Sequence, residues 1–147
     1  VMEDKVKAAR DMGFEVVNAK ENDPVKKVRE LTNGIGADAV IVAVGVSQAN
    51  QQALEMLKRV EGRILLFAAG YPVPKLEVDS NYIHYRKMEL IGTYGADMQD
   101  FITSAKLLNE KRVDMSKLVE TTFPLDKIQE AYKVASDPAS YRVSVLL

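Results

Sequence analysis

Few side chains in this sequence are suited to metal or acid–base chemistry. It contains one histidine, His84, and no cysteine. Without cysteine it can build neither a disulfide framework nor a thiolate metal site, and one histidine needs carboxylates or a second chain to complete a metal site. The acidic residues nearest His84 are Asp79 and Glu89, and the segment between them is polar and aromatic. We interpret His84 as a structural, hydrogen-bonding residue and expect no catalytic zinc from this chain alone.

Glycines are the residues whose positions best suit ligand binding. Gly45, Gly70 and Gly95 each follow a short run of mainly apolar residues. Glycine allows the backbone to approach a ligand closely, and open α/β sheets bind ligands where parallel strands end. An ordinary tight turn between a strand and a helix would use the same residue. These three glycines are therefore candidates for contact with a bound molecule.

The apolar runs that precede these glycines predict strands at 39–44, 63–69 and 89–94. The stretch 34–47 shows no polar alternation, which is typical of a strand buried on both faces of a parallel sheet. We therefore predict a central strand there. The expected fold class is α/β, with a parallel sheet flanked by helices.

Helical spacing and capping residues predict the elements around these strands. Gly13 is expected as a left-handed C-cap, Asp23 and Ser47 as N-caps. Segment 81–87 is polar and aromatic, and we predict neither a helix nor a strand there. The predicted helices cover 4–12, 24–32, 47–61, 97–108 and 126–135, and further short strands cover 14–17, 76–78, 118–123 and 141–147.

The composition restricts the class of protein. The 147 residues fit a domain of ordinary size, and 47% hydrophobic residues suffice for a core. A formal net charge of -1 gives no field that would attract nucleic acid or an anionic membrane. Residues 1–12 have a charged helical pattern, unlike a signal peptide or a membrane segment. We therefore expect a cytoplasmic protein that binds neither nucleic acid nor membrane.

Four segments together resemble the zinc-dependent medium-chain alcohol dehydrogenases. They read EVVNAKENDPVKKVRELTNGIGADAVIVAVG, GRILLFAAG, ELIGTYG and FPLDKIQEAYKVASDPASYRVSVLL, and they follow the order of the family along the whole chain. The run NYIHYRKMELIGTYG is most similar to the sorbitol (polyol) and threonine dehydrogenase branch. The resemblance implies a Rossmann sheet that binds NAD or NADP, and a parent enzyme in which zinc polarises the oxygen of a secondary alcohol or polyol.

The resemblance also assigns cofactor contacts to main-chain groups of three turns and to two basic side chains. Val44, Gly45 and Val46 match the turn at the cofactor ribose; Ala68, Ala69 and Gly70 match the turn beneath the nicotinamide; Thr93, Tyr94 and Gly95 match the segment that completes the nicotinamide pocket. Lys5 matches a basic residue near the adenosine ribose, and Arg142 one on the pyrophosphate, where a guanidinium offers forked donors.

Two parts of the family pattern are missing from this sequence. It has no GxGxxG turn and no amino-terminal domain that would hold the zinc. We therefore expect the carboxyl-terminal portion of a longer enzyme, which lacks the first two Rossmann strands and is catalytically incompetent alone. Residues 1–96 would belong to the cofactor-binding domain, and 97–147 would return to the catalytic domain.

A sheet without its first two strands needs a replacement for their contacts. In the usual strand order these two strands lie between the strands expected at 14–17 and 39–44. Either those two strands pair directly or another chain covers the exposed edges. We therefore expect a homo-oligomer. The alternatives left open are a non-catalytic cofactor-binding or oligomerisation module and a zinc-free quinone reductase of the same superfamily.

Overall fold

The computed structural model describes residues 2–137 and 139–147 and divides the chain into two compact units, Val1–Tyr94 and Gly95–Leu147. The first unit contains α1 (Glu3–Asp11), α2 (Pro24–Leu31), β1 (Ala39–Val42), α3 (Ser47–Met56), β2 (Arg63–Leu66), α4 (Ser80–Arg86) and β3 (Glu89–Gly92). The second contains α5 (Met98–Asn109), β4 (Val119–Pro124), α6 (Ile128–Ala135) and β5 (Arg142–Leu146), with 3-10 turns at Ser116–Leu118 and Leu125–Lys127.

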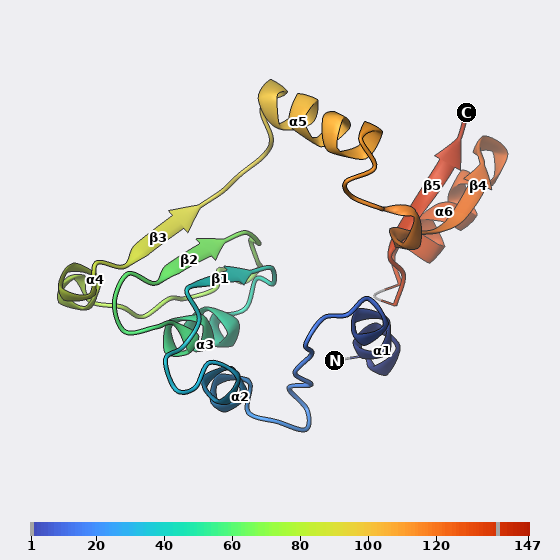
Figure 1. The fold of residues 1–147 in the computed structure, drawn as a ribbon. Helices are drawn as coiled ribbons and strands as arrows, with labels where there is room; N and C mark the ends of the chain where they lie inside the picture. The colour runs from blue at the N-terminus through green and yellow to red at the C-terminus, as the bar shows by residue number, and fades with distance from the viewer. Residues whose placement is uncertain (1, 138) are drawn as a thin grey trace. The chain divides into compact units, whose positions relative to one another are not determined.

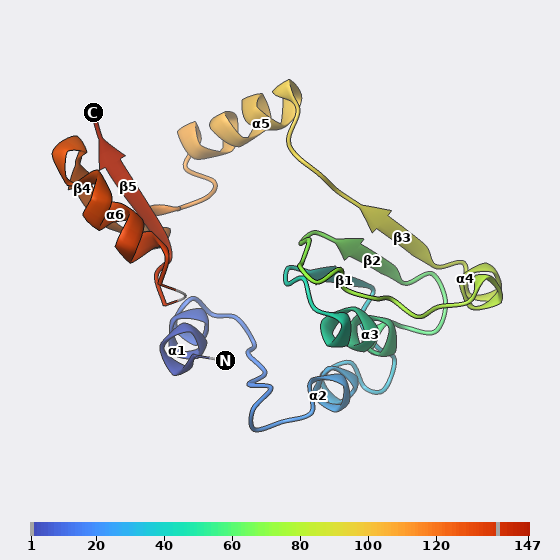
Figure 2. The same ribbon diagram turned by 180° about the vertical axis from the view of Figure 1, so that it is seen from behind.

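The first unit is built on a parallel three-stranded sheet in the order β1-β2-β3 (Figure 1). Helix α3 lies against one face of this sheet, and the view from behind agrees (Figure 2). The core forms between them because both apolar faces lose water there. Its buried members are Val42, Ala53, Leu54, Leu57, Ile64 and Met88.

The prediction of parallel strands flanked by helices is confirmed, but the place of the first strand was wrong. β1 is an edge strand, not a central one, and β2 lies in the middle of the sheet. The side chain of Ile41 is 65% exposed, whereas Val42 beside it is buried. α3 covers only one face, so alternate residues of an apolar run remain in contact with solvent.

Two further predicted strands are absent among the described residues. Segments 14–17 and 76–78 have no strand assignment, and β1 pairs only with β2. The direct pairing of 14–17 with the 39–44 strand is therefore wrong. A strand requires a hydrogen-bonded neighbour, and neither segment has one. Leu76 and Val78 pack against the core through their side chains instead.

Helix boundaries follow capping residues more closely than apolar spacing. Asp23 caps α2, its carboxylate accepting bonds from the N–H groups of Val25 and Lys26. Asp79 does the same for α4 by accepting from Tyr82, at 2.7 Å, and this helix was not predicted. α3 ends at Met56, earlier than the predicted 61, because Leu57 turns extended.

The second unit is a small β–α–β arrangement. β4 and β5 pair in parallel, and α6 packs on both of them. α5 begins with a reciprocal capping box in which the side chains of Asp97 and Asp100 each accept a bond from the other's N–H. Within the described residues, no helix of either unit is long and apolar enough to cross a membrane.

Candidate functional site

The turns that follow β1 and β2 touch each other through their glycines. A Cβ placed on Gly45 would collide with the carbonyl oxygen of Ala69 and lie 2.5 Å from the Cα of Gly70. A Cβ on Gly70 would collide with the carbonyl oxygen of Gly45. Real Cβ atoms do not approach backbone this closely. Two predicted site residues from different strands are thus brought together, and both positions require glycine.

Hydrogen bonds hold the two turns in this position. The carbonyl of Val42, the last residue of β1, accepts bonds from the N–H groups of Phe67 and Ala68, both at 3.1 Å. The N–H of Val46 donates to the carbonyl of Val44 at 3.0 Å, which closes a three-residue turn around Gly45. The carboxyl edge of β1 and β2 is therefore a fixed surface made mainly of backbone.

Ser47 and Asn50 anchor the chain that follows Gly70. Ser47 was predicted as an N-cap, but it is the first residue of α3 and its Oγ accepts a bond from the Lys75 N–H at 2.9 Å. The buried Asn50 donates through Nδ2 to the carbonyl of Lys75 at 3.1 Å. Sequence reasoning missed this pair. No local signal indicates it, because the two contacts join residues 25 and 28 apart in sequence.

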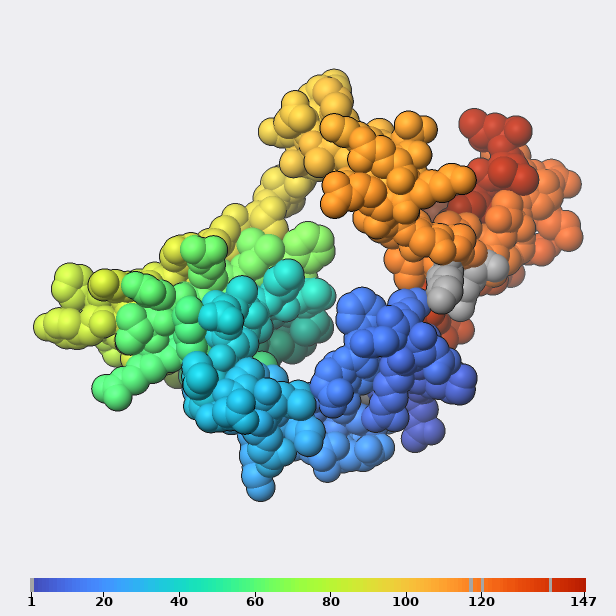
Figure 3. Space-filling model, in the orientation of Figure 1, coloured from blue at the N-terminus to red at the C-terminus, as the bar shows by residue number. Residues whose placement is uncertain are grey.

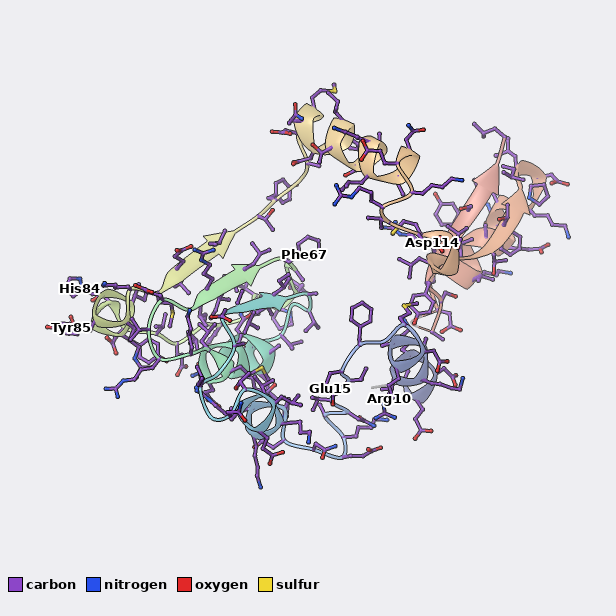
Figure 4. All side chains as sticks on the ribbon, in the orientation of Figure 1. Arg10, Glu15, Phe67, His84, Tyr85 and Asp114 are labelled. Atoms are coloured by element: carbon purple, nitrogen blue, oxygen red, sulfur yellow. The ribbon has the colours of Figure 1, made fainter. Side chains whose placement is uncertain are left out.

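Apolar side chains at these turns are open to solvent. Val44 and Val46 are about half exposed, and Phe67, labelled just beyond β2 in Figure 4, is 62% exposed. None of the residues 44–46 and 68–70 carries an ionisable side chain. The surface can therefore bind a flat or apolar group and hydrogen-bond it through the backbone, but these six residues cannot transfer a proton.

The third predicted turn is exposed. β3 ends at Gly92, and both Thr93 and Tyr94 are exposed at the end of the first unit. Among the described residues, no hydrogen bond joins either of them to the Gly45 and Gly70 turns. Gly95 begins the second unit with a left-handed φ of 69°.

The two predicted basic contacts lie on different units. Lys5 is half-buried in the first turn of α1. Arg142 is the first residue of β5 and is paired with Val119 of β4. Its side chain is exposed and forms no ion pair among the described residues. An exposed guanidinium retains all of its donors for an anion.

His84 is not the hydrogen-bonding residue that we expected. It lies exposed on α4, where its ring meets the Tyr85 ring edge-on, with centroids 5.0 Å apart (Figure 4). Within the described part of the chain its imidazole forms no hydrogen bond, and no group of three or more His, Asp or Glu side chains could hold a metal ion. The described residues therefore do not fit a zinc site.

The turns at Gly45 and Gly70, in contrast, suit the backbone approach of a dinucleotide. The two glycines let the turns after β1 and β2 meet at the sheet edge where open α/β folds bind such ligands. Small residues, Ala68 and Ala69, continue this edge. This edge of the sheet is therefore the candidate binding surface of the first unit.

Comparison with known proteins identifies the family of this chain. The family model described as zinc-binding dehydrogenase matches residues 1–110. A sorbitol dehydrogenase from Halalkalibacterium halodurans is 25% identical over 142 residues, which cover 95% of this chain and 40% of that protein. The chain thus spans about two fifths of the length of such relatives.

Solved structures show the same fold. A zinc-binding dehydrogenase from Clostridium scindens has a TM-score of 0.86 at 22% identity, covering 100% of this chain and 41% of that one. One from Sinorhizobium meliloti, solved bound to NADP, has a TM-score of 0.84 at 17% identity, covering 99% and 43%. From the family match, this chain belongs to the zinc-binding dehydrogenases, the zinc-type medium-chain alcohol dehydrogenase family, and corresponds to their carboxyl-terminal portion.

Proposed function

We propose that this chain supplies part of the nicotinamide cofactor site of an oxidoreductase that acts on a secondary alcohol or polyol. In that reaction the alcohol carbon gives a hydride to NAD or NADP, its hydroxyl proton is released, and a carbonyl product forms. The zinc and the substrate contacts would come from a part of the parent enzyme outside this chain. No residue of this chain is assigned a catalytic role.

The contact between Gly45 and Gly70 carries this proposal. It brings the backbone of the turns after two neighbouring strands together at the carboxyl edge of the sheet. The NADP-bound relative from Sinorhizobium meliloti shares the fold and adds support. The resemblance between this sequence and the family then gives the role of each residue.

Most of the proposed contacts use an exposed group or a small residue. The cofactor ribose would lie at residues 44–46, the carboxamide of the nicotinamide at residues 68–70, and the rest of its pocket at residues 93–95. Lys5 would lie near the adenosine ribose and Arg142 on the pyrophosphate, through charge-assisted hydrogen bonds. In the same scheme residues 1–96 form the cofactor-binding part and residues 97–147 pack on the catalytic domain of the parent.

A titration of the purified chain with NADH, followed by the fluorescence of the nicotinamide, tests this proposal. We expect saturable binding that Arg142→Gln weakens about tenfold, because a charge-assisted hydrogen bond to phosphate is lost. Gly45→Ala should abolish binding, since its Cβ would displace the Gly70 turn. Gly92→Ala is the matched control, because a Cβ there meets nothing within 4 Å.

The result of this titration distinguishes the proposed cofactor site from a non-catalytic module. Equal affinities for Gly45→Ala and Gly92→Ala, with both variants folded by circular dichroism, would contradict the proposed site. Absence of any saturable binding would confine the role to the longer parent. The chain would then be a non-catalytic module, a second candidate favoured by the lack of a metal-binding group among the described residues.

A zinc-free quinone reductase of the same superfamily would use the same edge for its cofactor. Zinc-binding and activity assays of the longer protein that contains this chain distinguish the two activities. We expect it to bind zinc and to oxidise a polyol with NAD or NADP. Reduction of a quinone by a zinc-free preparation would favour the alternative instead.

A further inference from the structure

A pocket rich in cationic side chains opens at the amino-terminal edge of the first unit's sheet. This is the edge opposite the Gly45 and Gly70 turns, since the strands are parallel. Its volume is about 740 Å³, within the range of small-molecule sites. It is lined by Arg29, Gly34, Ile35, Lys58, Arg59, Val60 and Arg86.

Backbone hydrogen bonds fix the loops that carry these residues. Ala37 and Leu57 form a parallel bridge, so the loops before β1 and β2 lie side by side, as the cyan and green segments of Figure 3 show. The N–H of Glu61 donates to the carbonyl of Arg86 at 2.8 Å, which ties the end of α4 to the same place. The pocket is therefore a built feature of the fold.

The positive charges of the pocket are only partly balanced. Lys58 pairs with Asp38 at 2.8 Å. Arg29 donates only to carbonyl oxygens, and Arg86 stacks over the Tyr82 ring with its guanidinium carbon 3.8 Å from the centroid. Arg59 is exposed and has no hydrogen bond or ion pair with any described residue. Three uncompensated cations face one pocket, in a chain whose net charge is -1.

No lining residue that the structure describes is acidic. Glu30 and Glu61, which directly follow lining residues in the sequence, are engaged by Lys27 at 3.4 Å and by Lys87 at 3.7 Å. Ile35 and Val60 add apolar surface, being 65% and 45% exposed. Arg59 and Arg86 form no ion pair with a described residue, and the Asp38 carboxylate is held by Lys58, so the cluster favours an anionic ligand.

We propose that this pocket binds a small multivalent anion that carries phosphate or carboxylate groups. Arg59 and Arg86 would donate to its oxygens, while Arg29, held by its carbonyl partners, contributes positive potential. The site does not rest on the proposed cofactor site, which uses the other edge of the sheet.

Titration of the chain with inorganic pyrophosphate and with citrate, at low ionic strength, tests the proposal by two-dimensional amide NMR. We expect saturable shifts at residues 34–36, 58–60 and 86 with at least one probe, and the tighter probe identifies the anionic group. Affinity should fall steeply as salt is raised, since exposed charges are screened within about 10 Å at 0.1 M. Shifts confined to residues 44–46 and 68–70 would place the anion at the cofactor edge and overturn the proposal.

Matched variants separate a specific site from diffuse attraction. Arg59→Gln and Arg86→Gln should each weaken binding about tenfold, because each removes a charged donor. Lys26→Gln removes one positive charge from an exposed position of α2 outside the pocket and should leave affinity within twofold. Saturable binding by neither probe, or equal losses in Lys26→Gln and Arg59→Gln, would refute the site.

Discussion

At the scale of single residues, Asp38 and Lys58 join the loops that precede β1 and β2. Their side chains are 2.8 Å apart, and the Asp38 carboxylate is 88% exposed. The hydrogen bond from Lys58 and the charge of its ammonium hold the pKa of Asp38 below its ordinary value of 3.8. Because the pKa of Asp38 is lower in the folded chain, the pair stabilises the fold at every pH above the ordinary value of 3.8. The stabilisation is lost as the pH falls through the pKa of the folded state.

A carboxyl-detected NMR titration of Asp38 checks this expectation. We expect a midpoint below pH 3.8 in the natural chain and a return toward 3.8 in Lys58→Gln. Lys27→Gln serves as a control, because its ion pair involves Glu30 and not Asp38. The same midpoint in the natural chain and in Lys58→Gln would show that Lys58 does not perturb Asp38.

The residues of the candidate site differ in how well sequence could identify them. Gly45 and Gly70 could be predicted because a glycine that ends an apolar run marks the end of a buried strand. The contact between their backbones could not, since it depends on how β1 and β2 pair. The contacts of Ser47 and Asn50 with Lys75 join residues 25 or more apart in sequence, beyond the reach of any local pattern.

At the scale of elements, Arg29 links α2 to α3 and to the loop before β1. Its guanidinium donates to the carbonyls of Ile35, Glu55 and Leu57 at 2.7 to 2.8 Å, and to Gly34 at 3.3 Å. The carbonyls of Glu55 and Leu57 lie at the carboxyl end of α3, where a cation is favourable. Arg29 is thus the residue that fixes how these elements meet.

We expect Arg29→Met to lower the free energy of unfolding by about 2 to 3 kcal/mol, because it removes several charge-assisted hydrogen bonds and keeps the apolar stem. Urea denaturation followed by circular dichroism measures this loss. Lys27→Met on the same helix breaks only an exposed ion pair, and should cost about 0.5 kcal/mol or less. Similar losses in both variants would show that the carbonyl contacts of Arg29 contribute little.

Elements with strong local signals could be predicted, and those that need a partner could not. Asp23 and Asp97 each begin a helix where expected, because a capping side chain acts on its own turn. The strand at 14–17 was wrong, since the pattern of residues cannot supply a neighbouring strand. α4 was missed because its polar and aromatic residues show no apolar helical stripe, although Asp79 caps its first turn.

At the scale of the whole molecule, the first unit's sheet carries apolar side chains on the face opposite its core. Ile41, Leu65 and Ile91 are aligned across the three strands, on the face opposite the buried Ile64. Ile41 is 65% and Ile91 40% exposed. Aligned apolar side chains on an open sheet favour association with another surface.

We therefore expect the isolated chain to self-associate, and Ile41→Lys to reduce this without loss of the fold. Sedimentation velocity over a range of concentrations measures the change. Val73→Lys, at an 80% exposed position in the loop after β2, is the control and should leave self-association as it is. A monodisperse natural chain that melts cooperatively as a monomer would contradict this expectation.

The meeting of Gly45 and Gly70 also limits how this sequence can vary. A side chain at either position collides with main-chain atoms of the other turn, and main-chain atoms are common to all residue types. No exchange at one position can therefore compensate for an exchange at the other. Among sequences that retain this fold, we expect the two positions to be fixed independently, with no correlated pair of substitutions to reveal their contact.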